Sequence, residues 1–117
     1  MPVLSCRVAA VAGAGALAAM LATGAAPADE PARIAVTLKD HVFTPCEIHV
    51  PAGRPTILVV TNQDTGPEEF DSSALKVEKV IVGGTYGTIR LRPLGPGRYP
   101  FMGEFHPDTA KGVVIAQ

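Results

Sequence analysis

The chain has 117 residues, a length that fits one domain, with 10 Lys and Arg against 11 Asp and Glu. Its formal net charge of −1 provides no basic surface, so neither nucleic acid nor an anionic membrane is an expected partner. The first quarter of the chain differs in composition from the rest and is considered separately.

The N-terminal segment has the three parts of a secretory signal peptide. Arg7 supplies a positive charge, residues 8–26 are apolar or small, and Ala26-Pro27-Ala28 ends the segment with small residues. A retained membrane anchor is the alternative, because the apolar run approaches the length of a bilayer span, but much of it is Ala and Gly. We expect a signal peptide at 1–28 and export to the periplasm.

The mature domain predicted from this cleavage covers residues 29–117, about 89 residues, which can bury one modest core. Loss of Arg7 changes the formal charge from −1 to about −2. Only Cys46 remains, so no internal disulfide is expected, and Cys46 is interpreted as a small buried side chain. We expect no membrane insertion after cleavage.

Alternating or continuous apolar patterns predict strands, in chain order, at residues 32–39, 43–50, 55–62, 86–91, 98–102 and 112–116. Residues 32–39 alternate like a half-buried strand, whereas the unbroken apolar run at 57–60 predicts a central strand covered on both faces. Pro45 belongs at a sheet edge or a bend. Residues 74–82 fit neither a strand nor a helix period.

Gly- and Pro-rich turns separate these segments at intervals of roughly 8–12 residues, which is typical of sandwiches and barrels. No segment has the pattern of an amphipathic helix. The mature chain is therefore predicted to be an all-β domain of about seven strands.

Several phrases resemble the cupredoxin family. Residues 95–101 followed by His106 are similar to the Pro-Gly turn, Tyr-x-Phe strand and ligand loop near the end of that family, and residues 51–62 are similar to an earlier turn and strand. Residues 67–70 and 103–112 resemble a subgroup, the cupredoxin-like periplasmic proteins that accompany bacterial iron-uptake permeases. The resemblance implies a Greek-key β-sandwich of cupredoxin type and an iron permease in the inner membrane as partner.

Matched to that family, the blue-copper ligand positions fall on Glu68, Gly103, His106 and Lys111. Of these four positions, only His106 carries the residue that serves as a copper ligand in the family. A type 1 blue-copper centre needs a thiolate, and Cys46 lies too far upstream to supply it. The resemblance therefore implies a cupredoxin-like protein that has lost its type 1 site.

Two segments carry carboxylates and an imidazole that the cupredoxin fold would place at one end: Glu68, Glu69, Asp71, Glu104 and His106. We predict metal binding through Glu68, Glu69, Glu104 and His106. This ligand set suits iron, copper(II), zinc or manganese rather than copper(I), and a copper or iron ion is the expected cofactor. Glu68 and Glu69 cannot face the same side of a strand, whereas Glu104 and His106 share a side if their segment is extended.

A structure without metal is the alternative, in which the carboxylates are solvated and Lys111 neutralises Glu68 or Glu104. The remaining side chains near these segments have simpler expected roles. Met102, Tyr99 and Phe101 are expected to fill the core, and Phe70 and Phe105 to wall the site. His41 and His49 are expected on the surface, and His41 could also be a ligand at a second site.

The resemblance implies a periplasmic metal-binding accessory protein of an iron-uptake system. The alternatives are a metal-free module that docks on a membrane permease through its acidic end and an electron-transfer cupredoxin. A small domain without a recognisable nucleophile and base is not expected to be an enzyme.

Overall fold

The computed structural model describes Cys6 and residues 30–117. The predicted signal peptide at 1–28, apart from Cys6, and its cleavage position lie outside the described residues. The described residues form nine strands: β1 (Ala32–Lys39), β2 (Val42–Thr44), β3 (Glu47–Val50), β4 (Thr56–Asn62), β5 (Glu68–Ser72), β6 (Val77–Ile81), β7 (Tyr86–Leu91), β8 (Gly97–Gly103) and β9 (Lys111–Ala116). Within this part of the chain, no helix is long and apolar enough to cross a membrane.

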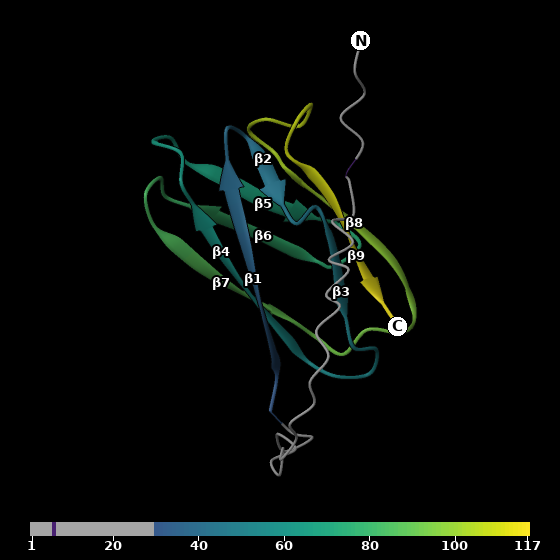
Figure 1. Ribbon diagram of the computed structural model, residues 1–117. Coiled ribbons are helices and arrows are strands. Elements are labelled where there is room, and N and C mark those ends of the chain that lie inside the picture. Colours follow the sequence, from purple (N-terminus) through teal and green to yellow (C-terminus); the bar gives the residue numbers. More distant parts are fainter. Residues whose placement is uncertain (1–5, 7–29) are drawn as a thin grey trace, which may run out of the picture.

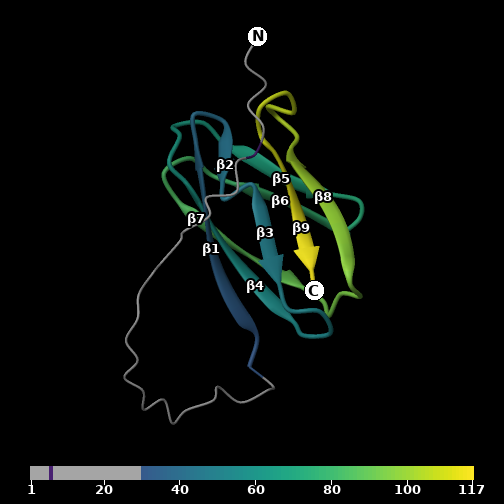
Figure 2. The same ribbon diagram turned by 45° about the vertical axis from the view of Figure 1, so that its right-hand side comes forward.

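The strands form two facing sheets, shown from two sides in Figures 1 and 2. One sheet has the order β2-β1-β4-β7 and the other β3-β9-β8-β5-β6. Strand β4 lies between β1, its parallel neighbour, and β7, its antiparallel neighbour, and most of its residues are buried. This confirms the predicted all-β sandwich and its central strand.

Three phenylalanines contributed by both sheets lie at the middle of the core. The ring of Phe70 on β5 stacks on Phe101 on β8 at 4.7 Å between centroids, and Phe43 on β2 meets both rings edge-on at 5.8 and 5.2 Å. All three are almost fully buried, so they hold the sheets together through apolar burial and favourable ring geometry. Phe70 thus packs in the core. The prediction that it forms a wall of the metal site is wrong.

The structure has two more strands than the sequence predicts. The chain passes from one sheet to the other between β2 and β3, so Pro45 divides the predicted segment 43–50 in two. Strand β5 was not predicted, because its inward side chains include the polar residues Glu68 and Ser72. The strand therefore shows no alternation of apolar and polar residues in the sequence. The Ser72 hydroxyl donates to the carbonyl oxygen of Pro100 at 2.7 Å, which makes its burial acceptable.

Cys46 is joined to Cys6 by a disulfide bond. Cleavage after Ala28 would remove Cys6 together with the signal peptide, so this bond belongs to the unprocessed chain. The expectation of no internal disulfide concerns the chain after cleavage, and it stays a prediction for that form. Cys46 is half-buried rather than a fully buried core residue.

Candidate functional site

Glu68 is a buried carboxylate whose oxygens are both engaged. It begins β5, and only 2% of its surface is exposed. Its Oε1 accepts hydrogen bonds from the backbone N–H groups of Glu69 at 3.1 Å and Phe105 at 2.9 Å. Its Oε2 lies 2.6 Å from Nδ1 of His106. Three partners compensate for the lost hydration of this carboxylate, so its lone pairs are largely used within the protein.

His106 lies in the loop between β8 and β9, which is built from two consecutive turns. Its backbone N–H donates to the carbonyl oxygen of Gly103 at 3.1 Å, and its carbonyl oxygen accepts from the N–H of Ala110 at 2.9 Å. Because Nδ1 faces the Glu68 carboxylate, the neutral imidazole keeps its lone pair on Nε2. The side chain is 36% exposed, so Nε2 is the ring atom left for an ion from solvent.

Gly103, which the sequence resemblance matches to a cysteine position, is buried beside Glu68. A Cβ atom at this residue would lie 2.6 Å from Cδ of Glu68 and 2.7 Å from Cβ of Ala110, closer than real Cβ contacts. The Glu68 side chain therefore fills the space that a side chain at residue 103 would need. Glycine is required here by close approach of neighbouring atoms.

A second imidazole, from His41, covers the ring of His106. The two ring centroids are 3.5 Å apart and the planes differ by 8°, which is a face-to-face stack. His41 belongs to the turn between β1 and β2, and this turn lies at the same end of the sandwich as the β8–β9 loop (Figures 1 and 2). His41 is on the surface as predicted, with 48% of its side chain exposed. The sequence gives no sign of its contact with His106.

Asp64 fixes the turn that carries His41. Asp40 and His41 both have positive φ, 52° and 60°, as a two-residue hairpin turn of type I′ requires. Their backbone N–H groups donate to the Asp64 carboxylate at 2.7 and 3.0 Å. Desolvation by burial raises the pKa of Asp64, but these two hydrogen bonds and the nearby imidazoles outweigh it, and the pKa lies below its usual value.

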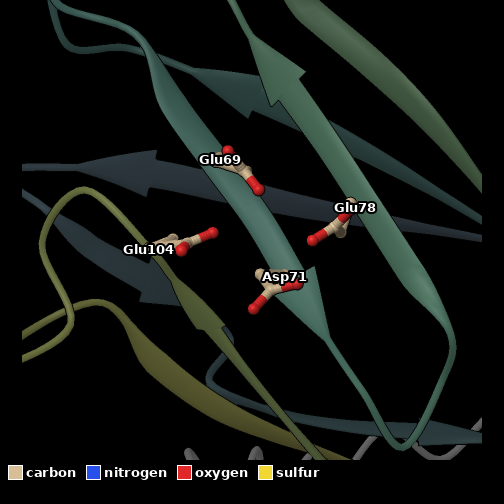
Figure 3. A group of neighbouring side chains, drawn as sticks. All are labelled: Glu69, Asp71, Glu78 and Glu104. Carbon is tan, nitrogen blue, oxygen red and sulfur yellow. The ribbon is translucent and has the colours of Figure 1, made fainter.

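The other predicted ligands lie in a separate acidic cluster, formed by Glu69, Asp71, Glu78 and Glu104. Each residue offers an oxygen within 4.8 Å of those of the others. Figure 3 shows that these carboxyl groups come from β5, β6 and the segment after β8. The chain turns at Glu104 rather than continuing extended, and the Glu104 N–H donates to the carbonyl oxygen of Glu69 at 2.8 Å.

The four predicted ligands are thus placed as two pairs. Glu68 lies with His106, and Glu69 lies with Glu104. Glu68 and Glu69 project to opposite faces of β5, because successive side chains of a strand alternate. Glu104 and His106 do not act as one pair, since the segment that carries them is a turn.

The crowded carboxyl groups of the acidic cluster favour the protonated form of Glu69. A hydrogen bond with the Glu104 carboxyl, followed by desolvation and the charges of Glu104, Glu78 and Asp71, raises the pKa of Glu69 above its usual value. A raised carboxyl pKa means that the folded chain favours the protonated form. Its contribution to stability is therefore complete below the unfolded pKa and is lost as pH rises through the folded pKa.

We expect Glu104→Gln to raise the melting temperature at neutral pH and to change it little near pH 4. Glutamine keeps a hydrogen bond to Glu69 through its amide and removes one of the repelling charges. Thermal unfolding of both proteins between pH 4 and 8 measures the difference, which should grow as pH rises. Asp108→Asn, an exposed change in the same loop but outside the cluster, is the control. An equal gain at every pH would contradict this account.

The neighbouring residues differ in part from expectation. Lys111 forms no ion pair with Glu68 or Glu104 among the residues that the structure describes. Met102 and Phe105 are exposed, so Met102 does not fill the core and Phe105 does not wall the site from inside. Tyr99 packs against the core, half-buried, and Phe101 lies within it, as predicted.

Comparison with known proteins supports the fold. The family described as cupredoxin-like domain matches residues 11–116. A protein of Rickettsia prowazekii (strain Madrid E), described as uncharacterized, is 40% identical over 82 residues, which cover 70% of this chain and 66% of that protein. The chain thus spans just under two thirds of that relative.

Solved structures with low sequence identity have the same architecture. The metal-binding domain of the Cu(I)-exporting P-type ATPase CopA of Streptococcus pneumoniae D39 has a TM-score of 0.62 at 17% identity, covering 73% of this chain and 84% of that one. Auracyanin A, a blue copper protein of Chloroflexus aurantiacus, has a TM-score of 0.62 at 12% sequence identity. The match covers 75% of this chain and 100% of that one. A purple cupredoxin from Nitrosopumilus maritimus has a TM-score of 0.56 at 19% sequence identity. The match covers 74% of this chain and 99% of that one. These likenesses confirm the predicted type of sandwich.

Proposed function

This chain belongs to the cupredoxin-like domain family, and we propose that it is a periplasmic metal-binding accessory protein without a type 1 blue-copper site. The observation that carries the proposal is the Glu68–His106 pair at the end of the sandwich. A carboxylate that holds Nδ1 of a histidine orients the ring and makes Nε2 a better ligand, as in many metal sites. Copper(II) is the ion that we propose first, because imidazole suits it.

The residues present do not suit a blue-copper centre. Such a centre needs a thiolate with two imidazoles, and its cysteine position is Gly103 in this chain. The space for a side chain there is taken by Glu68, and Cys46 lies on the chain between β2 and β3, far upstream of that position. We therefore propose no electron transfer through a thiolate-bound copper.

The association with iron uptake rests on the sequence resemblance of residues 67–70 and 103–112 to proteins that accompany iron permeases. In this proposal the protein is exported, binds copper or iron outside the inner membrane, and serves an iron permease there. It is not proposed to be an enzyme. Iron would favour the oxygen ligands of the acidic cluster more than a single imidazole.

The proposal is tested by titrating the purified protein with copper(II) in a calorimeter and recording its visible spectrum. We expect one ion per chain, with no intense blue colour, and an affinity at least about tenfold lower in His106→Ala, which removes the ligand. Iron titrations of the wild type and of a Glu69→Gln, Glu104→Gln double variant test the acidic cluster in the same way.

His49→Ala is the matched control for copper. His49 on β3 also faces a carboxylate, with Nε2 3.1 Å from Oε1 of Glu47, and its side chain is 46% exposed. The His49→Ala variant should bind copper(II) as tightly as the wild type does. Absence of stoichiometric binding of either ion, or an equal loss in His49→Ala and His106→Ala, would reject the proposal.

A metal-free docking module is the second candidate, and the surface around the acidic cluster favours it. Exposed Val80 lies opposite Glu69 in the β5–β6 pair, and exposed Met102 lies opposite Asp71 in the β5–β8 pair. Apolar side chains beside carboxylates suit a partner with both apolar and basic residues. Co-purification with the permease that Glu104→Lys abolishes, without any metal binding by the wild type, would support this candidate.

A further inference from the structure

We infer that His41 supplies a second imidazole to an ion held by His106, and that Glu68 remains a hydrogen-bond partner rather than a ligand. The inference rests on the proposed metal binding at His106. It adds a residue from a different sheet and excludes one that the sequence predicts. The site is then a pair of imidazoles for a borderline divalent ion such as copper(II) or zinc(II).

Glu68 is excluded by its surroundings. Its Oε1 already accepts two backbone N–H groups, and its Oε2 is 2.6 Å from Nδ1 of His106. An ion at Oε1 would leave one of its two N–H donors without a partner, which costs free energy, and an ion at the remaining lone pair of Oε2 would have to enter a buried place. The carboxylate therefore fixes the ring of His106 and directs Nε2 outward.

His41 is the ligand-bearing side chain in direct contact with that ring. The stack places its imidazole 3.5 Å from that of His106, and both side chains are partly exposed. Its backbone is fixed by the two hydrogen bonds from the turn to Asp64. The turn thus keeps a second imidazole beside the ring of His106 without any change of the main chain.

The stack itself is the arrangement without metal. Imidazole lone pairs lie in the ring plane, so two nearly parallel rings cannot both point a lone pair at one ion. One ring must turn about its side-chain bonds. His106 is held at Nδ1 by Glu68, whereas the nearest charged partner of the His41 ring is Asp64, 4.0 Å from Nε2. His41 is therefore the ring that turns when the ion binds.

The test compares His41→Phe with His41→Ala in copper(II) and zinc(II) titrations of the full chain. Phenylalanine can keep the stack on His106 but has no nitrogen, so it separates ligation from packing. We expect both variants to bind at least about tenfold more weakly than the wild type. An affinity of His41→Phe equal to that of the wild type would overturn the inference and leave the proposed function intact.

A second measurement counts the nitrogen ligands. Electron paramagnetic resonance of the copper(II)-loaded wild type should show coupling to two imidazole nitrogens, and His41→Phe should show coupling to one. A single coupled nitrogen in the wild type would also overturn the inference. A wild type that binds no metal would reject the proposed function together with this inference, and that outcome differs from both of the others.

Discussion

Gly103→Ala is expected to destabilise the domain by about 1–3 kcal/mol, the usual cost of forcing extra volume into a packed interior. The added Cβ would meet Glu68 and Ala110 at distances that real Cβ atoms do not show, and both neighbours are buried. Neither neighbour is the mobile end of an exposed side chain, so the strands must shift. Denaturant unfolding of the variant and the wild type measures the effect.

Gly66→Ala is the control for this prediction. No atom lies within 4 Å of a Cβ built at Gly66, so this change should leave stability within about 0.5 kcal/mol of the wild type. A double-mutant cycle adds a sharper test. Gly103→Ala should cost less in a Glu68→Ala background, because two of the three nearest contacts of the added Cβ, both with Glu68, are removed. Equal costs in both backgrounds would show that Glu68 does not fill this space.

Glu68→Ala is expected to cost about 2–4 kcal/mol. It leaves the N–H groups of Glu69 and Phe105 without acceptors and opens a cavity beside Gly103. Glu68→Gln keeps an oxygen for these donors and a polar group beside His106, so it should cost about 1 kcal/mol. The free energy of unfolding from denaturant titration gives both values.

The comparison for this prediction is the second Glu–His pair of the chain. Glu47→Ala removes the carboxylate 3.1 Å from His49, but both side chains are partly exposed, so the loss should stay below about 1 kcal/mol. A Glu68→Ala variant no less stable than Glu47→Ala would mean that the buried carboxylate contributes nothing through its backbone contacts.

The elements that the sequence predicts best are those that need no knowledge of their neighbours. The apolar run of β4 and the alternation of β1 follow directly from burial on two faces or one. Strand β5 escapes prediction because Glu68 and Ser72 point inward, and their burial depends on partners 38 and 28 residues away. Strand β6 is ambiguous because it is an edge strand with three consecutive exposed residues.

The candidate site was predicted only in part, for the same reason. The sequence indicates Glu68 and His106 through a family resemblance, and the structure places them in contact. It also groups Glu104 with His106 by assuming an extended segment, whereas that segment turns and brings Glu104 to Glu69. The stack of His41 on His106 arises only when the two sheets close, so no local pattern reveals it.

The close packing of Glu68 against Gly103 also restricts how this domain could acquire thiolate chemistry by stepwise substitution. A cysteine introduced first at position 103 collides with the glutamate. A histidine introduced first at position 68 forfeits the acceptor for two main-chain amides. Each of these single substitutions is therefore expected to destabilise the domain before the other can be made.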